Sequence, residues 1–459
     1  MKRFLLIFCV AVLCGCSQLS LPEKQIYHVA NEYYFAPHLL PNVLPEMQFA
    51  AYWIDRCACP DSLILSAKQI DSLNAAICRN GLTRNIEEVP GNDSLLTFYN
   101  AMAWKYIERK RNYICEAELY QEDGSRLLRD ETEFYLKNLP QDSLEFVSLC
   151  LDSLALLTHF TDEKMLPGEP FLSVQPLDTE FNQMQNNGLD MGNLTFAICY
   201  SRDKNWVFQI NATSMGWMPR QNFFMLNSTD FISHWQTGII RIPYSQYWRQ
   251  ADKNDFAGVL RMGTNVWIDT TFTDQNLYKI LCPQSSHLDF AYVQKQDVTE
   301  KPHRLTSRNL LNDAFLWLNY PYGWGDTDQF VDCSKFIQKL FALYGIQMPR
   351  NGDAQGFSWQ NLKDIFPELS HRSIIDKNGI PGFTLLRMPG HIMLYIGNQE
   401  GREYAIHVLY RYLQIDGEIV TSRVPNRVVV SDIELGEGTQ RGSYLNRLSH
   451  IINPGIVTK

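Results

Sequence analysis

The chain has 459 residues, of which 45% are hydrophobic and 12% aromatic, and its formal net charge at neutral pH is −9. This much apolar sequence can bury several cores, which excludes an intrinsically disordered chain. The length predicts about three or four domains. The negative charge argues against nucleic acid as a partner and against binding of anionic polymers through bulk positive charge.

The first residues have the features of an export signal. A basic start at Lys2 and Arg3 precedes an apolar run that is too short to span a bilayer and that ends at Leu13-Cys-Gly-Cys16. These last four residues look like a lipoprotein box, which predicts cleavage before Cys16 and attachment of lipid to it. A plain secretory signal is the alternative. We therefore expect residues 1–16 to be the signal and the mature protein to be lipid-anchored in the cell envelope, on the periplasmic side of a membrane.

Residues 17–165 are predicted to form a mainly helical domain. Ser62–Ile77, Leu95–Trp104 and Ser143–Leu157 carry apolar residues at helical spacing, without a catalytic constellation. The chain has 11 cysteines, and an export context would permit disulfides among them, although buried thiols are an equal alternative. Cys57-Ala-Cys59 lacks a second Cys/His pair at zinc spacing, so we expect no metal site.

Short alternating segments separated by turns begin near Leu166 and predict two small β-barrels, over residues 166–230 and 231–303. The predicted strands are Leu194–Ser201, Trp206–Asn211 and Met215–Asn222 in the first barrel, and Ile239–Pro243, Gly258–Gly263 and Phe290–Val293 in the second.

A cysteine at the start of a helix is the first sign of chemistry. A loop rich in Gly, Pro and aromatic residues leads into Asp332-Cys333-Ser334, and apolar residues then recur at helical spacing as far as Tyr344. Asp332 stands where an N-cap belongs, and Gly345 where the helix would stop. In the first turn, free N–H groups and the positive end of the helix dipole favour the thiolate of Cys333 over the thiol. A cysteine that only fills the core is the simpler alternative.

Two extended segments downstream each carry a histidine that can serve this cysteine. His391–Gly397 alternates as a strand does, Tyr404–Tyr410 is a second extended run, and the turn-like Gly397–Gly401 separates them. If these strands pair across the turn, His391 and His407 come together on one face. His391 would then be the general base and later the acid, and His407 the group that orients it.

Together these residues resemble the NlpC type of bacterial cell-wall cysteine peptidase. The resemblance covers residues 304–459 and rests on Tyr322-Gly-Trp-Gly325, Asp332-Cys-Ser334, Pro349-Arg-Asn351 and Pro389–Gly397, followed by a later histidine. It implies a papain-like α+β catalytic domain with a Cys333-His391-His407 triad. The run from Tyr200 to Pro219 is similar to the bacterial SH3-like domains that accompany such peptidases. The expected fold is thus a multidomain α+β protein with a helical N-terminal region and two SH3-like barrels.

The resemblance also implies contacts with the amino end of a substrate. The residues concerned are Tyr322, Trp324, Asp332, Ser334, Arg350 and Asn351, with Tyr200 and Asp203 from a first barrel that abuts the cleft. Asp332 can meet a free ammonium, and a tyrosine hydroxyl beside the sulfur can help to hold an oxyanion. Asp326 stands where the family often has a second glycine, and Asn351 where it often has aspartate. The uncharged amide of Asn351 weakens the grip on an ammonium.

These observations predict a cysteine endopeptidase that hydrolyses γ-D-glutamyl–diamino acid bonds in peptidoglycan stem peptides. The resemblance implies muropeptides with a free N-terminal L-Ala as substrates, and hence wall recycling. We expect no metal or organic cofactor, a monomer, and no partner besides the peptide and the membrane. The alternatives are a catalytically silent lipoprotein that binds peptidoglycan, and acyl transfer or amidase action by the same triad.

Overall fold

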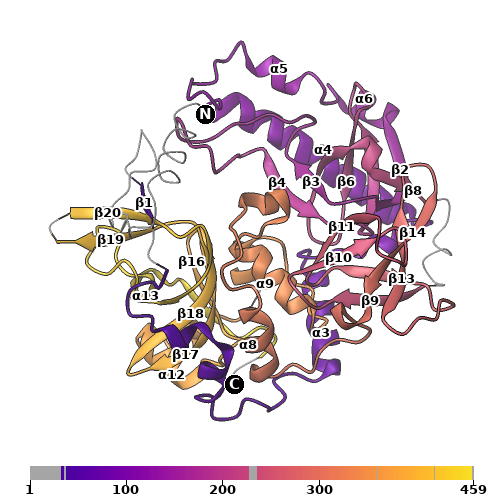
Figure 1. The fold of residues 1–459 in the computed structure, drawn as a ribbon. Coiled ribbons are helices and arrows are strands. Elements are labelled where there is room, and N and C mark those ends of the chain that lie inside the picture. The colour runs from indigo at the N-terminus through magenta and orange to yellow at the C-terminus, as the bar shows by residue number, and fades with distance from the viewer. Residues whose placement is uncertain (1–32, 36–37, 227–234, 358, 418, 457–459) are drawn as a thin grey trace, which may run out of the picture.

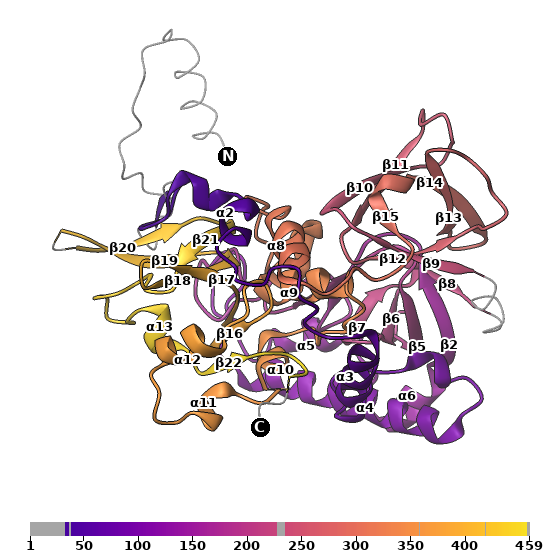
Figure 2. The same ribbon diagram turned by 90° about the horizontal axis from the view of Figure 1, so that it is seen from below.

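The computed structural model describes residues 33–35, 38–226, 235–357, 359–417 and 419–456. The predicted signal and Cys16 lie outside these residues. Two sheets of seven strands lie on one side of the molecule, a third sheet of five strands lies on the other, and α8 and α9 lie between them (Figures 1 and 2). The mixed α+β architecture is the predicted one. Within the described ranges, no helix has the length and apolar character needed to cross a bilayer.

The first sheet has the strand order β4-β3-β7-β6-β5-β2-β8. Its strands are β2 (Cys150–Leu157), β3 (Thr161–Lys164), β4 (Gln185–Leu189), β5 (Leu194–Tyr200), β6 (Trp206–Ile210), β7 (Met215–Pro219) and β8 (Phe223–Met225). The three strands predicted here are confirmed as β5, β6 and β7.

The helix predicted over Ser143–Leu157 is wrong in its second half. The helix α6 (Ser143–Ser148) stops early, and the chain continues as β2, which pairs with β5 and β8. Leu154–Leu157 are all buried, because this strand is covered on both faces. A continuous apolar run of this kind fits a buried strand as well as a buried helix, so its spacing could not decide between them.

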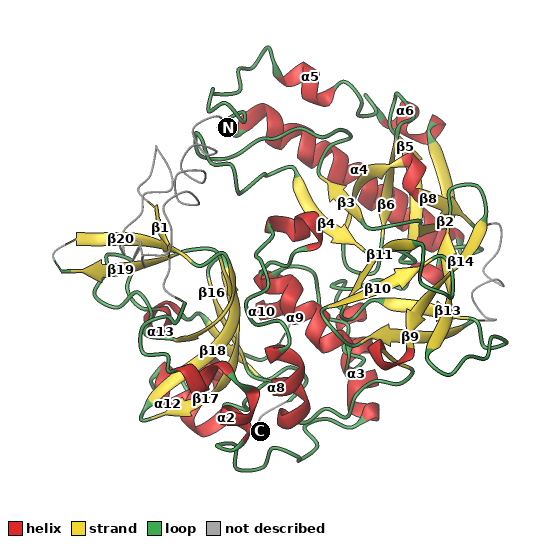
Figure 3. Cartoon of the chain, viewed as in Figure 1, coloured by secondary structure: helices red, strands yellow, loops and turns green. Residues whose placement is uncertain are grey.

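The second sheet has the order β11-β10-β14-β13-β12-β9-β15. Its strands are β9 (Gln236–Ile240), β10 (Tyr244–Trp248), β11 (Phe256–Arg261), β12 (Asn265–Ile268), β13 (Leu277–Pro283), β14 (Leu288–Gln294) and β15 (Val298–Thr299). Two of the predicted strands are confirmed as β11 and β14, whereas the one predicted over Ile239–Pro243 overlaps β9 only at Ile239 and Ile240, where that strand ends. Both sheets are strongly curved (Figure 3), which is compatible with the SH3-like class that stays a prediction.

The N-terminal region is helical as predicted, but it is divided between two cores. The helix α4 (Asp93–Glu116) buries Ala103 and Ile107 against the first sheet. The helix α3 (Ala67–Arg79) instead packs Leu73 and Ile77 into the core of the C-terminal part. This earlier stretch also includes β1 (Tyr33–Phe35), α2 (Ala50–Ile54) and, beyond α4, α5 (Thr132–Leu136). The strand β1 pairs in parallel with β20, so the beginning of the described chain is joined to the C-terminal part.

The C-terminal part is built around an antiparallel sheet in the order β21-β18-β17-β16-β22. Its strands are β16 (Leu385–Met388), β17 (His391–Gln399), β18 (Arg402–Leu409), β21 (Arg427–Asp432) and β22 (His450–Ile452), and β19 (Tyr412–Asp416) and β20 (Ile419–Val424) form a projecting hairpin. Its helices are α8 (Ser307–Phe315), α9 (Cys333–Ala342), α10 (Gly352–Phe357), α11 (Leu362–Ile365), α12 (His371–Asn378) and α13 (Tyr444–Arg447).

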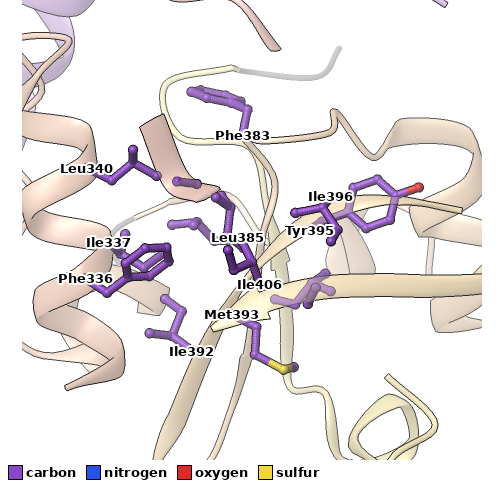
Figure 4. Packing of buried hydrophobic residues seen from close by; sticks show 14 of the residues in the cluster. Phe336, Ile337, Leu340, Phe383, Leu385, Ile392, Met393, Tyr395, Ile396 and Ile406 are labelled. Carbon is purple, nitrogen blue, oxygen red and sulfur yellow. The ribbon is translucent and has the colours of Figure 1, made fainter. Parts of the chain in front are cut away.

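The predicted helix after Cys333 is confirmed as α9, and its apolar stripe fixes it to the sheet. Phe336, Ile337 and Leu340 are fully buried and point toward Ile392 and Ile406 (Figure 4). The side chain of Asp332 caps the helix by accepting the backbone N–H of Lys335 at 2.7 Å. Burial of the stripe and the N-cap together hold the first turn of α9, and therefore Cys333, in one place.

A buried cluster of charges joins the three sheet-containing parts. Arg261 of β11 has no exposed side-chain surface and binds Asp190, after β4, at 2.7 Å and Asp326 of the C-terminal part at 2.6 Å. Lys335 of α9 lies 3.1 Å from the second oxygen of Asp326, and Lys339 also binds Asp190. Although burial acts to raise the pKa of Asp190, Arg261 and Lys339 overcome it and hold that pKa far below its usual range. The cluster sets how the sheets sit relative to α9.

Removing one carboxylate from this cluster should destabilise the protein strongly. We expect Asp326→Ala to lower the free energy of unfolding by about 3–5 kcal/mol, because it leaves Lys335 buried without a carboxylate partner and Arg261 with Asp190 alone. Chemical denaturation measures the change. The matched control is Asp61→Ala, which breaks an exposed Asp61–Arg308 pair of similar geometry and should have little effect. Equal effects of the two substitutions would contradict a structural role for the buried cluster.

Candidate active site

A cleft with a volume of about 1620 Å³ separates the first sheet and α4 from the C-terminal part. Cys333 and His391 both line it. Cys333 is the first residue of α9 and His391 the first residue of β17, so each stands at the end of an element where the cleft can reach it. The thiol also meets the backbone N–H of Ile392, the residue next to His391.

The two histidines come together as the strand pattern predicts. The strands β17 and β18 pair across the turn, with Leu394 opposite Ile406. His391 is three residues from Leu394 and His407 one residue from Ile406, so both rings point to the other face. Nε2 of His391 lies 2.7 Å from Nδ1 of His407. A single hydrogen bond therefore joins them.

The third member of this hydrogen-bonded chain is Ser431, which is not among the residues predicted from the sequence. Nε2 of His407 lies 2.9 Å from the hydroxyl of Ser431 on β21. If His391 Nε2–H donates to His407, and His407 Nε2–H donates to Ser431, then Nδ1 of His391 keeps a lone pair that can take a proton. A serine on a strand with ordinary alternation carries no sequence signal, because only the register of β18 against β21 brings it to His407.

Burial sets the protonation states of the cysteine and the histidines. It raises the pKa of the Cys333 thiol to about 12, Asp332 adds to the rise, and the N–H groups of Ile392 and Ser334 only partly oppose it. Burial therefore favours the thiol and opposes the helix terminus, which was expected to favour the thiolate. Burial also lowers the pKa of His391 to about 4 and that of His407 well below its usual range. At neutral pH the site holds a thiol beside a neutral base.

The predicted ammonium contact Asp332 has a partner within the protein. Both of its oxygens accept hydrogen bonds from Arg350, at 2.8 and 3.2 Å, and Ser334 donates to it at 2.9 Å. Although burial acts to raise the pKa of Asp332, Arg350 overcomes it and keeps the carboxyl ionised. Asp332, Ser334 and Arg350 all line the cleft. An incoming ammonium would thus meet a carboxylate that is already paired.

The first sheet reaches this ion pair through Asn187 of β4. Its side-chain oxygen accepts from Nε of Arg350 at 2.5 Å and from Lys335 at 3.0 Å. Its amide donates to Ser214 at 2.8 Å, and Ser214 in turn donates to the fully buried Glu163 at 2.9 Å. A continuous chain of hydrogen bonds therefore runs from the accessory sheet to the N-cap of α9. No catalytic motif contains Asn187, so only the packing of the domains discloses it.

Three further predicted residues line the cleft: Tyr322, Trp324 and Asn351. Trp324 donates its indole N–H to the carbonyl of Asn182 at 2.9 Å, so it also fastens the first sheet's loop to the C-terminal part. Asn351 caps α10 by accepting the N–H of Ala354 at 2.8 Å. This cap gives a structural reason for an uncharged residue at that position.

Asp326 stands in a backbone conformation that favours glycine, with φ of 73°. This explains why family members often carry glycine there. In this chain the carboxylate compensates for the strain through its bonds to Arg261 and Lys335. The departure from the family pattern is thus part of the buried charge cluster.

The structure does not bring Tyr200 and Asp203 to the cleft. They flank the turn between β5 and β6, where Asp203 accepts from Ser201 at 2.5 Å and the ring of Tyr200 packs under Arg220. The first barrel was expected to present this hairpin, but it presents β4 and the loop before it instead. From this part, Phe181, Gln183, Gln185 and Asn186 line the cleft, as do Gln175, Thr213, Ser214 and Met215. Tyr200 and Asp203 are therefore not placed to contact a substrate in this cleft.

Tyr322 lines the same cleft as Cys333 and is a candidate donor to an oxyanion formed there. Burial raises the pKa of its hydroxyl well above the usual range, with Asp332 and Cys333 adding to the rise, so the hydroxyl stays protonated. We expect Tyr322→Phe to lower kcat for a bound peptide by about 10- to 10³-fold, because one donor to the developing oxyanion is lost. Steady-state kinetics with a thermal unfolding curve checks this, since Phe keeps the ring contact with Tyr410. An unchanged kcat would remove Tyr322 from that role.

A cysteine-bearing helix packed on an antiparallel sheet with two joined histidines, beside a deep cleft, is an arrangement suited to thiol hydrolases. Comparison with known proteins agrees. Residues 319–425 match the NlpC/P60 family. An NlpC/P60 endopeptidase from Photobacterium damselae subsp. piscicida is similar in structure over 92% of this chain and 96% of its own, with a TM-score of 0.66 and 16% identity.

An NlpC/P60 family protein from Bacillus cereus ATCC 10987 covers 66% of this chain and 100% of its own, with a TM-score of 0.48 and 15% identity. No curated protein matches the sequence. The chain therefore contains an NlpC/P60 domain, which confirms the family resemblance, and proteins of this family are generally cell-wall cysteine peptidases. Ser431 lies beyond the matched range.

Proposed function

We propose that this protein is a cysteine endopeptidase that hydrolyses the γ-D-glutamyl–diamino acid bond of peptidoglycan stem peptides. The observation that carries the proposal is the line of groups Cys333, His391, His407 and Ser431, of which the first two face one cleft and the last three are linked by hydrogen bonds of 2.7 and 2.9 Å. A silent domain has no need to keep all of these groups in register.

In the proposed reaction, Nδ1 of His391 takes the thiol proton as the sulfur of Cys333 attacks the carbonyl carbon. The base is neutral at working pH, so it is free to accept that proton. The carbonyl oxygen becomes an oxyanion that the Tyr322 hydroxyl stabilises. The C–N bond then breaks, His391 gives its proton to the leaving amine, and a thioester remains. Water, deprotonated by His391, attacks the thioester, releases the acid and restores the thiol.

We propose short muropeptides with a free N-terminal L-Ala as the substrates. The loop before β4 and the helix α4 line the cleft on the side away from the C-terminal part. This wall limits the length of peptide that fits. The carboxylate of Asp332 lines the cleft while it is paired with Arg350. A substrate ammonium can bind to the same carboxylate. Anchoring through Cys16 remains part of the proposal and would place the protein at the envelope, where such peptides arise.

The test compares three substrates with the purified protein: the free L-Ala-γ-D-Glu-diaminopimelate tripeptide, its N-acetylated form, and intact cell-wall fragments. Mass spectrometry follows release of L-Ala-γ-D-Glu. We expect turnover of the free tripeptide and at least about tenfold slower turnover of the acetylated form, which lacks the ammonium. Cleavage of intact wall without cleavage of the free tripeptide would contradict the recycling role. Cleavage of none of the three would favour a silent binding protein.

A further inference from the structure

The cleft is rich in positive charge although the chain as a whole carries −9. Of the described residues, six arginines and two aspartates line it: Arg84, Arg109, Arg350, Arg411, Arg441 and Arg447, with Asp332 and Asp353. Both aspartates are already paired, Asp332 with Arg350 and Asp353 with Arg387. A cleft lined mainly by positive charge attracts ligands of negative charge, so this cleft is suited to an anionic ligand.

Two of these arginines stand on the wall next to the proposed base. Arg447 lies over the ring of Tyr444 at 5.6 Å, and that ring lies 6.0 Å from the ring of His391. Arg441 is on the same segment, three residues before Tyr444, and is exposed in the cleft. Neither arginine forms an ion pair with any residue that the structure describes.

The backbone that carries the two arginines is held in place. Tyr444 is buried, and its backbone N–H donates to Leu435 at 3.1 Å, while the N–H of Leu445 donates to Ile433 at 2.6 Å. The side chain of Ser443 caps the short helix that ends at Arg447. The two side chains thus extend into the cleft from a fixed backbone, and a guanidinium is the group that proteins use to bind a carboxylate through two parallel hydrogen bonds.

We propose that Arg441 and Arg447 form a subsite for a carboxylate of the leaving half of the substrate. The inference rests on the proposed function, because it uses the direction of the reaction. His391 gives its proton to the leaving amine, so the residue that bears this amine lies on the side of His391. Arg350 and Asp332 occupy the other side, beside the amino end. The subsite would favour a diamino acid with a free carboxylate over the same diamino acid with that carboxylate converted to an amide.

The test measures binding and turnover separately. Calorimetry on the Cys333→Ala protein, in which no bond is broken, compares the tripeptide that has a free carboxylate on the diamino acid with its amide. We expect the acid to bind about 10- to 100-fold more tightly, and R447Q and R441Q in that background to remove most of the difference while leaving the affinity for the amide unchanged. R126Q is the matched control, because Arg126 is an exposed arginine outside the cleft.

Two outcomes would overturn the subsite: equal binding of acid and amide, or an R447Q variant that weakens both peptides equally. R447K separates charge from geometry, and we expect it to keep part of the preference because a lysine has the charge but not the bidentate fork. If the acid binds in preference and R447Q removes that preference, while the wild-type protein cleaves neither peptide, the subsite stands and the proposed peptidase function fails.

Discussion

Replacing Cys333 with alanine should reduce peptide hydrolysis by about 10⁴-fold or more, because the proposed covalent intermediate forms on its sulfur. Cys333→Ser should be nearly as inactive, since a hydroxyl is harder to deprotonate than a thiol whose pKa is already about 12. Both side chains fit the volume of cysteine, so the thermal unfolding midpoint should change little. Initial rates and an unfolding curve for each variant measure the two effects. Retained turnover in the alanine variant would place the nucleophile elsewhere.

Replacing His391 with glutamine should lower kcat by about 10²- to 10⁴-fold, the usual contribution of a general base. In the wild-type protein the pKa of His391 is lowered to about 4, mainly by burial and secondarily by Arg447, while Asp332 opposes the shift. Below this pKa the base is protonated, so the rate should fall as pH drops through about 4. The thiol titrates only near pH 12, so the rate should stay flat through neutral pH. A rate–pH profile of kcat/KM tests this, and an acid limb near pH 7 would contradict it.

His407 provides the matched control for this prediction. His407→Asn keeps an oxygen at the position of Nδ1 that can accept from Nε2 of His391, whereas His407→Ala keeps no acceptor there. Both variants lose the hydrogen bond to Ser431, because the asparagine side chain is too short to replace Nε2. We expect a smaller loss of kcat for asparagine than for alanine, and both losses to be smaller than that of His391→Gln. If the two His407 variants lose equal activity, the orienting hydrogen bond to His391 does not contribute.

The local part of the site could be predicted from the sequence because its signals are local. The stripe after Cys333, the N-cap Asp332 and the alternation around His391 each involve neighbours within a few residues, and the structure forms α9, β17 and β18 from them. Because side chains alternate between the two faces of a strand, the pairing of β17 with β18 then brings the two histidines to the same face. The wrong helix prediction at β2 also has a physical cause. The apolar run of β2 fits a helix and a buried strand equally well, and its partner β5 decides between them.

What the sequence could not disclose depends on contacts between distant segments. Asn187 reaches Arg350, and Arg261 reaches Asp326, only because three parts of the chain pack on one another. The protonation state of Cys333 follows from its burial in that packing rather than from its helix position alone. The turn that carries Asp203 was expected at the cleft, yet the first sheet presents the loop before β4 there. Domain orientation has no local signature in a sequence.

The most direct measurement of the proposed chemistry is to trap the acyl-enzyme. The wild-type protein is mixed with excess L-Ala-γ-D-Glu-diaminopimelate, quenched with acid within the first turnovers, digested and mapped by mass spectrometry. We predict an added L-Ala-γ-D-Glu acyl group on the peptide that contains Cys333, and its absence in the Cys333→Ala protein. Release of product at a normal rate, with no acyl group on that peptide at any quench time and with the alanine variant still active, would contradict nucleophilic attack by Cys333.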